Sequence, residues 1–274
     1  MLKPGSLSAS RGVIRADDPA GFRAAFARIA AMLQSPEVQV KKEEITGQIL
    51  VEGFIEGAEF ALEGIMHRGS LQVLALFDKP DPLDGPYFEE TIYVTPSRLD
   101  QEAQAGLVRA VEQATRALGL FHGPIHAELR LNARGPWILE VAARPIGGLC
   151  ARALRFGAES VSLEELILRH ALGRDVRGLR REEAASGVMM IPIPGAGIYQ
   201  GVEGLDEALE TPGVREIRIT AKTGQKLVPW PEGSSYLGFI FSNASSPEQV
   251  EEALRRAHQR LSFAISPALA VVGG

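Results

Sequence analysis

The chain has 274 residues, a formal net charge of −5 and a pI near 5.7, which disfavours nucleic acid as its main partner. Hydrophobic residues make up 45% of the chain, as in globular proteins, and no apolar run approaches the roughly 18 residues of a transmembrane helix. The single cysteine, Cys150, excludes an internal disulfide and favours a reducing compartment, so we predict a cytoplasmic protein.

The N-terminal segment combines a short strand with a loop of small residues. Leu2–Pro4 predicts the strand, and residues 5–12 form a Gly/Ser-rich loop. Such a loop can bring backbone N–H groups and hydroxyls to a phosphate, although most loops of this composition are ordinary turns. Asp18 followed by Pro19 predicts the start of a helix that continues to about Leu33.

The middle of the chain predicts several strands and then a helix. The strands are expected at residues 48–55, 59–66, 71–77 and 88–94, and the helix at residues 99–118. Three carboxylates fall within residues 51–59, where an edge strand can bind a purine and a glutamate can bind ribose hydroxyls. The alternative is a hairpin with solvated glutamates.

A hairpin is predicted from two alternating runs, residues 125–131 and 137–144, which flank a five-residue loop. Symmetric closure predicts the pairs Glu128 with Glu140, His126 with Ala142, and Arg130 with Ile138. The alternate residues, among them Leu129 and Leu139, then form an apolar face. Because like charges directly opposite each other are unfavourable, the two glutamates call either for a divalent cation or for neutralisation by Arg130 and Arg144.

The remainder predicts two helices and then a second lobe of mixed α and β structure. The helices are expected at residues 149–156 and 163–172. From about Ser186 the predicted elements are strands at 188–194, 214–221, 225–230 and 236–242, a short helix at 205–210, and a helix capped by Ser246.

Five histidines occur in the chain, and His126 alone falls on the polar face of the hairpin. The other four show no spacing typical of metal ligands, so we interpret them as surface or supporting groups: His67, His122, His170 and His258. Cys150 has no neighbouring base in the sequence and is interpreted as a buried packing residue.

Four motifs in this order resemble the ATP-grasp superfamily of carboxylate–amine ligases. They are Leu2-Lys3-Pro4 with its loop, Val51-Glu52-Gly53-Phe54-Ile55 with Glu59, Glu128, and Glu140-Val141-Ala142-Ala143-Arg144-Pro145. In the second lobe, residues 195–199 and 236–241 are similar to the C-terminal domain of L-amino-acid (dipeptide) ligases.

The resemblance implies an α+β protein with the ATP-grasp fold, in which two α/β lobes with antiparallel sheets precede a small C-terminal α+β lobe. It places the ATP-grasp domain at residues 1–185, with a nucleotide-loop subdomain (1–56) and a metal-binding subdomain (57–185), and the C-terminal lobe at 186–274. Members carry a further N-terminal domain, so we expect this chain to be the C-terminal part of a larger enzyme, or to act with a separate N-terminal subunit.

The resemblance also implies ATP and Mg²⁺ as cofactors. The resemblance implies that Lys3 contacts the phosphates and is catalytic. The nucleotide-binding residues are Lys3, Ser6, Ser8, Ser10 and Gly12 of the loop, Glu52, Gly53, Phe54 and Ile55 of a hinge that binds adenine, and Glu59 for the ribose. Glu128 and Glu140 hold the metal. Arg144 is catalytic, and the substrate residues are His126, Arg144, Gly147, Gly148 and Glu89. From its local sequence alone, the segment around Glu89 can equally be an ordinary strand.

The implied activity joins a carboxylate, an amino acid, to an amine through an acyl phosphate. Ala142 stands where the superfamily usually has asparagine, so we expect one firmly held metal and a poor second site. Ile146 is a separate departure, inserted before the glycine pair. The alternatives are a non-catalytic nucleotide-binding module or subunit of a split enzyme, and a biotin-carboxylase-like or purine-pathway ligase. Small molecules are the expected partners, without nucleic acid or membrane, and a homodimer is one assembly that the sequence allows.

Overall fold

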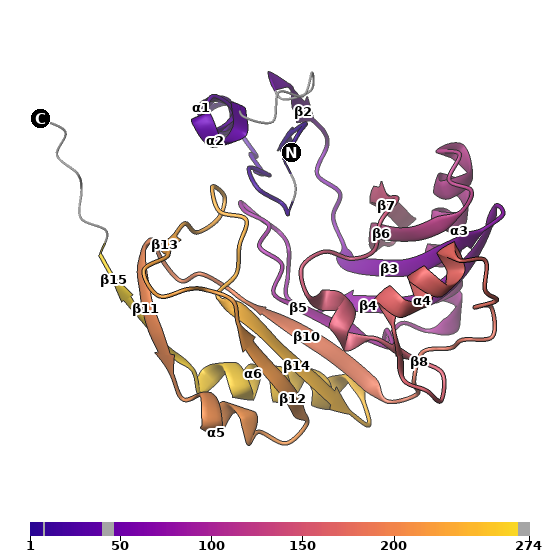
Figure 1. Ribbon diagram of the computed structural model, residues 1–274. Coiled ribbons are helices and arrows are strands. Elements are labelled where there is room, and N and C mark those ends of the chain that lie inside the picture. Colours follow the sequence, from indigo (N-terminus) through magenta and orange to yellow (C-terminus); the bar gives the residue numbers. More distant parts are fainter. Residues whose placement is uncertain (8, 40–46, 268–274) are drawn as a thin grey trace, which may run out of the picture.

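The computed structural model describes residues 1–7, 9–39 and 47–267. A small N-terminal subdomain pairs β1 (Leu2–Pro4) with β2 (Ile49–Val51) in antiparallel fashion and sets α1 (Pro19–Leu33) and the short α2 (Pro36–Gln39) beside them (Figure 1). Asp18 caps α1 as predicted, because its carboxylate accepts hydrogen bonds from the backbone N–H groups of Ala20 and Gly21.

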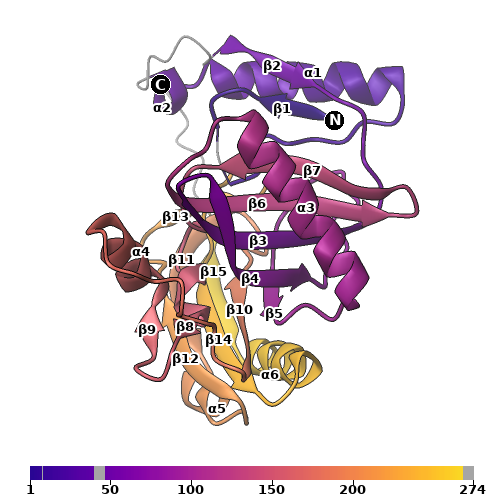
Figure 2. The same ribbon diagram turned by 90° about the vertical axis from the view of Figure 1, so that its right-hand side faces the viewer.

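An antiparallel sheet of eight strands forms the body of the molecule, in the order β12-β14-β10-β5-β4-β3-β6-β7. Its strands are β3 (Ala58–His67), β4 (Ser70–Lys79), β5 (Ile92–Thr95), β6 (Gly123–Asn132), β7 (Gly135–Ala142), β10 (Ala185–Ile191), β12 (Val214–Ile219) and β14 (Gly238–Ala244). In Figure 2 the N-terminal subdomain lies above the β6–β7 edge of this sheet.

The sheet continues across the boundary that the sequence placed near residue 185. β5 pairs with β10, for example Thr95 with Ser186, so β10 joins strands from both sides of that boundary. A smaller sheet, β13-β11-β15, completes the C-terminal part with β11 (Gly197–Glu203), β13 (Lys226–Leu227) and β15 (Ser262–Ser266). The sequence analysis assigned no element to β15.

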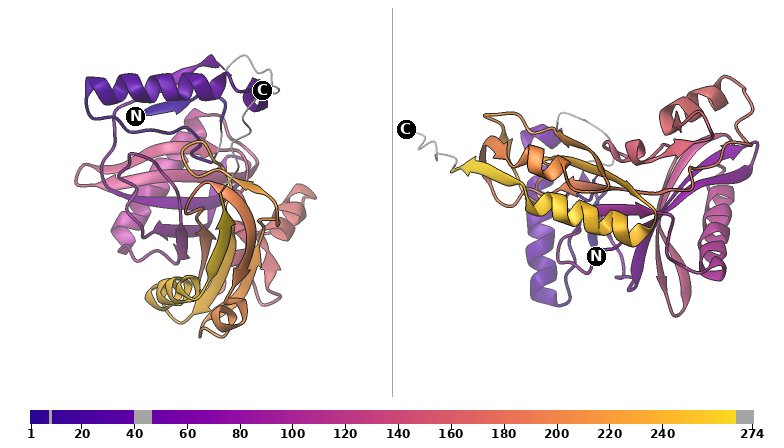
Figure 3. Two further views of the ribbon diagram at one scale, coloured as in Figure 1. Left: turned by 90° about the vertical axis from the view of Figure 1, so that its left-hand side faces the viewer. Right: turned by 90° about the horizontal axis from the view of Figure 1, so that it is seen from below.

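Helices cover both faces of the large sheet. α3 (Gln101–Ala117) packs Leu107 and Val111 against β3 and β6, while the opposite face carries η2 (Cys150–Ala153), β8 (Arg155–Phe156), β9 (Val161–Ser162) and α4 (Leu163–Ala171). Further along, α5 (Leu205–Leu209) and α6 (Pro247–Gln259) pack on the C-terminal strands, as the yellow helix in Figure 3 shows. No helix in the described part of the chain is long and apolar enough to cross a membrane.

Several predicted elements differ in extent, and the strand predicted at residues 225–230 is only β13. β2 ends at Val51 rather than residue 55, and residues 88–91 precede β5 instead of belonging to it. The helix predicted at 149–156 is only the single turn η2 followed by β8. Short apolar runs do not distinguish a strand from a buried loop, and the pairing partners that decide the matter lie elsewhere in the chain.

The predicted hairpin is confirmed near the two glutamates and differs beyond them. Glu128 pairs with Glu140, and His126 with Ala142. The loop is tighter than expected, because Asn132 pairs directly with Gly135. A β-bulge between Glu128 and Leu129 accounts for this change of register.

The bulge therefore changes which residue of β7 reaches the core. Arg130 pairs with Trp137 rather than Ile138, and Ile138 pairs with Leu129. Ile138 packs against the core, a role that the alternating pattern predicted for Leu139.

Candidate active site

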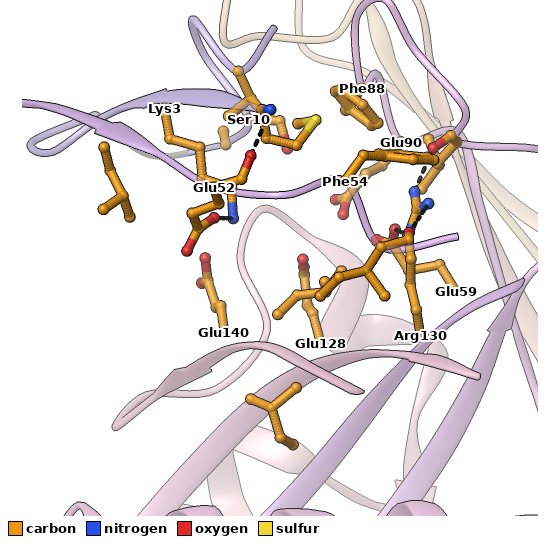
Figure 4. A pocket seen from close by; sticks show the side chains of 18 of the residues that line it. Lys3, Ser10, Glu52, Phe54, Glu59, Phe88, Glu90, Glu128, Arg130 and Glu140 are labelled. Atoms are coloured by element: carbon orange, nitrogen blue, oxygen red, sulfur yellow. Dashed lines mark hydrogen bonds and ion pairs between the residues drawn. The ribbon is translucent and has the colours of Figure 1, made fainter. Parts of the chain in front are cut away.

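A cavity of about 620 Å³ lies between the N-terminal subdomain and the β6–β7 hairpin. Its volume falls within the range of about 300–1,000 Å³ that is typical of small-molecule sites. Figure 4 shows Lys3, Ser10 and Glu52 on one side of the cavity, with Glu128 and Glu140 facing them from the hairpin. Charged groups from the two subdomains thus face the same space.

Most of the site residues expected from the sequence line this cavity. They are Lys3, Ser10, Glu52, Gly53, Phe54, Ile55, Glu59, Glu128, Glu140 and Arg144. The chain therefore gathers onto one cavity four motifs that are separated by up to about half of its length.

The other expected residues that the structure describes do not line the cavity. Ser6 is half-buried, the N–H of Gly12 donates to the carbonyl of Pro231 at 2.9 Å, and Glu89 is half-buried beside β5. Gly147 and Gly148 are exposed in the loop after Arg144. Ser8 lies outside the described residues.

Lys3 forms an ion pair with Glu52 within the N-terminal subdomain. Its Nζ lies 2.7 Å from a carboxylate oxygen of Glu52, and both side chains are partly exposed to the cavity. The pairing of β1 with β2 explains this contact, because Lys3 lies opposite Leu50, close to the position of Glu52. A ligand with phosphate groups can compete with Glu52 for this ammonium group.

The hairpin presents two carboxylates of different exposure. The side chain of Glu128 is 20% exposed and that of Glu140 is 54% exposed. Arg144 lies 3.8 Å from Glu140, too far for strong neutralisation, and Arg130 contacts neither of the two. Another cationic residue therefore neutralises the charge of Glu128.

Lys79 balances Glu128, and the sequence analysis missed it. Its Nζ lies 2.8 Å from Glu59, 2.5 Å from Glu90 and 3.3 Å from Glu128, and its side chain is 3% exposed. Lys79 ends β4, directly opposite Glu59 on β3. The predicted strand ended at residue 77, whereas extending the β3–β4 hairpin by two residues would have revealed the pair.

The pKa values in this cluster reflect three carboxylates that share Lys79, with Arg130 also bound to Glu59 and His126 to Glu128. Burial tends to raise the pKa of Glu128, but Lys79 and His126 outweigh it and hold that pKa well below its usual range. Burial and the charge of Glu128 raise the pKa of Glu90 to about 7. Burial also lowers the pKa of Lys79, yet the surrounding carboxylates more than compensate and raise it well above its usual value. Glu128 is therefore ionised at neutral pH and Lys79 is a cation.

His126 supports Glu128 from beneath the cavity. Its Nε2 lies 3.3 Å from Glu128, and its Nδ1 contacts the buried carboxylate of Glu63, which also accepts the N–H of Ile146. Burial lowers the pKa of His126, but the hydrogen bonds to Glu128 and Glu63 outweigh this and raise it to about 9. His126 thus orients Glu128 rather than lining the cavity.

Arg130 anchors the hinge to the sheet. Its Nε donates to Glu59 at 3.0 Å and its Nη1 donates to the carbonyl of Ile55 at 2.8 Å. The ring of Phe54 lies under two guanidinium groups, with Arg15 at 3.9 Å and Arg130 at 4.8 Å from the ring centroid. The hinge backbone is therefore fixed along one wall of the cavity.

The donor set at the hairpin fits a magnesium ion in part. Glu128 and Glu140 are directly opposed on one face and supply the carboxylate oxygens that Mg²⁺ prefers. Ala142, opposite His126, supplies no side-chain oxygen. The residues therefore suit one hard cation at Glu128 and Glu140 better than two.

The ATP-grasp domain model matches residues 1–153, more than half of the chain. The chain belongs to the ATP-grasp family. Residues 189–266 also match L-amino acid ligase C-terminal domain 2, so the family expected from the motifs is confirmed for both parts.

Individual relatives agree with this assignment. Alanine–anticapsin ligase of Bacillus subtilis is 32% identical over 160 residues, which is 54% of this ATP-grasp chain and 33% of that ligase. The crystal structure of L-amino acid ligase from Bacillus licheniformis has a TM-score of 0.78 and 30% identity, and covers 92% of this chain and 62% of its own.

A more distant structure is similar to this chain in fold only. The biotin carboxylase domain of Hydrogenobacter thermophilus 2-oxoglutarate carboxylase, in complex with MgADP, has a TM-score of 0.65 at 16% identity, and covers 96% of this chain and 57% of its own. The chain thus spans only part of the length of each relative that it matches.

Proposed function

We propose that the cavity binds ATP. The observation that carries this proposal is the convergence of Lys3, the hinge and the two hairpin glutamates on a single cavity (Figure 4). In this arrangement adenine lies along residues 53–55, and the phosphates extend towards Lys3 and the hairpin. Glu59, which already accepts from Lys79 and Arg130, keeps further lone pairs for ribose hydroxyls.

Glu128 and Glu140 are the residues that would hold Mg²⁺. When bound there, the ion would offset the negative charge of the phosphates. Lys79 and His126 keep Glu128 ionised and oriented for this role. Because Ala142 adds no oxygen, we propose one firmly held ion.

We further propose that the protein joins an amino-acid carboxylate to an amine. A carboxylate oxygen attacks the γ-phosphorus, the bond to the ADP oxygen breaks, and an acyl phosphate forms. The amine then attacks the carbonyl carbon, loses a proton, and phosphate leaves with the former carboxylate oxygen. The match of residues 189–266 to the L-amino acid ligase domain supports amino acids as the substrates.

Arg144 is the proposed residue for orienting the reacting carboxylate. It lines the cavity beside Glu140, and its guanidinium is half-exposed, with Nη1 donating to the carbonyl of Pro145 at 3.0 Å. A planar guanidinium can bind a carboxylate or acyl phosphate through two parallel hydrogen bonds. Positioning of the reactants is the main contribution expected from the protein in phosphoryl transfer. We propose the cytoplasm as the location, where ATP and free amino acids are available.

Isotope transfer tests the reaction. Amino acids labelled with ¹⁸O in the carboxylate are incubated with Mg-ATP, an amine and the protein, and the released phosphate is analysed by mass spectrometry. The proposed route places a single ¹⁸O atom in each phosphate. Arg144→Ala should slow this release strongly, whereas Arg215→Ala on β12 should not. Phosphate that contains oxygen from water alone would contradict the ligase reaction and favour a simple ATPase, and ATP binding without phosphate release would favour a non-catalytic module.

A further inference from the structure

Three histidines from distant parts of the chain meet at the end of β3 that is remote from the cavity. His67 ends β3, His122 lies between α3 and β6, and His170 lies in the last turn of α4. Their nearest ring nitrogens all lie within 4.8 Å of one another. Glu59, at the other end of the ten-residue strand β3, is about 26 Å away at the usual rise per residue. The cluster is therefore separate from the candidate active site.

The rings contact one another directly. Nδ1 of His67 lies 3.1 Å from Nε2 of His170, which is a hydrogen-bond distance. The ring of His122 stacks on that of His170 with centroids 4.1 Å apart and an interplanar angle of 22°. The single hydrogen bond accounts for the proximity of His67 and His170, but it does not account for the third imidazole.

The surroundings of His170 favour its neutral imidazole, the form that binds metals. Burial, with His122 and His67 as neighbours, lowers the pKa of the buried His170. Asp175, in the loop after α4, is an acidic group close enough to interact electrostatically with His67, although its oxygens already accept from Arg177 at 2.9 Å. A divalent cation would thus meet a neutral imidazole at His170 and a nearby negative charge at Asp175.

The geometry suits a small tetrahedral metal ion. Zinc–nitrogen distances near 2.1 Å place two ligating nitrogens about 3.4 Å apart in a tetrahedron. The nitrogens of His67 and His170 are already at 3.1 Å, so they need little movement. His122 is exposed, and its ring can turn out of the stack to direct a nitrogen at the same point. Three imidazoles with water in the fourth position form an established zinc coordination set.

We propose that His67, His122 and His170 form a zinc site that ties β3, the connection before β6 and α4 together. β3 and β6 are already paired as far as Met66 and Gly123, so the ion would chiefly tie α4 to this end of the sheet. The site is structural in this proposal, because it lies far from the cavity and requires no residue of it.

Metal titration of the tag-free, metal-depleted protein tests the site. Co²⁺ is added first, because a four-coordinate cobalt site absorbs visible light much more strongly than a six-coordinate one. The proposal predicts one equivalent of Co²⁺ with a four-coordinate spectrum, displacement by one equivalent of Zn²⁺, and a higher Tm with Zn²⁺. His122→Ala should weaken Zn²⁺ binding by about 100-fold or more, beyond the loss that removal of an outer-shell partner causes.

Matched variants separate this site from other metal-binding groups. His258→Ala on α6 and Glu140→Ala at the cavity should each leave the cobalt spectrum and the zinc affinity unchanged. Because His122 is exposed, its variant should keep the circular dichroism spectrum and the urea midpoint of the metal-free wild type. Equal zinc affinity in the wild type and in His122→Ala, or an exclusively six-coordinate cobalt spectrum, would overturn the proposal.

Discussion

Replacement of Lys79 by methionine probes the buried charge cluster next to the proposed metal residues. Methionine keeps much of the volume of lysine but leaves Glu59, Glu90 and Glu128 without their shared cation. Oxygens of these three carboxylates lie within 4.8 Å of one another. We expect Lys79→Met to be strongly destabilising at neutral pH and less so in acid.

Two estimates of the cost agree. The lost attraction between Lys79 and Glu128, 3.3 Å apart, is about 5 kcal/mol at an effective dielectric constant of about 20, and the desolvation of Lys79 offsets part of it. Removal of one partner from a buried ion pair typically costs about 3–5 kcal/mol. We therefore expect the free energy of unfolding to fall by about 3–4 kcal/mol at about pH 8.

The destabilisation caused by Lys79→Met should depend on pH. Without Lys79, the pKa of Glu90, which burial and Glu128 already raise to about 7, must rise further in the folded state. A carboxyl group with a raised folded pKa contributes stability at pH values below its unfolded pKa, and this contribution is lost as the pH rises through the folded value. The deficit of the variant should therefore be smaller at about pH 5 than at about pH 8.

Urea unfolding of wild type and Lys79→Met at the two pH values measures this deficit. Lys222→Met, at an exposed turn, is the control and should change the free energy of unfolding by less than about 0.5 kcal/mol. A deficit for Lys79→Met below about 1 kcal/mol, or one that is the same at both pH values, would refute the role of Lys79 as the cation that the three carboxylates share.

Two further predictions concern the hinge and the histidine beneath the cavity. Gly57→Ala should destabilise the fold by about 2 kcal/mol, because Gly57 has φ +122° and a Cβ there would lie 2.3 Å from the carbonyl oxygen of Leu131. Gly53→Ala, with nothing within 4 Å of the added carbon, should have little effect, and equal losses of stability would contradict this assignment. His126 has its pKa raised to about 9, so about 3 kcal/mol of stability should be present below about pH 6.5 and lost as the pH rises through about 9. Urea unfolding across this range measures it, and His126→Gln should flatten the profile; an unchanged slope in the variant would contradict the role of His126.

Local patterns predicted the parts of the fold that depend on neighbours in the sequence. Asp18 and Pro19 predicted the start of α1, and alternation predicted the pairing of Glu128 with Glu140, because capping and pleating act over a few residues. The bulge next to Glu128 was missed, since it depends on a loop tighter than symmetric closure allows.

Clusters of residues from distant parts of the chain could not be predicted from these local patterns. Lys79 meets Glu59, Glu90 and Glu128 only because β3, β4 and β6 pair side by side. The meeting of His67, His122 and His170 was not predicted for the same reason: their spacing in sequence carries no signal, and packing of α4 on the sheet brings them together.

The central claim is that the hairpin glutamates and Lys3 share one Mg-ATP site. Isothermal titration calorimetry of Mg-ATP into the wild type and Glu140→Ala tests it most directly, with Glu203→Ala on β11 as the control for loss of an exposed carboxylate. The account predicts binding to the wild type and to Glu203→Ala, and an affinity at least about tenfold lower for Glu140→Ala, a difference of about 1.4 kcal/mol. Equal affinities and heats for the wild type and Glu140→Ala would contradict it.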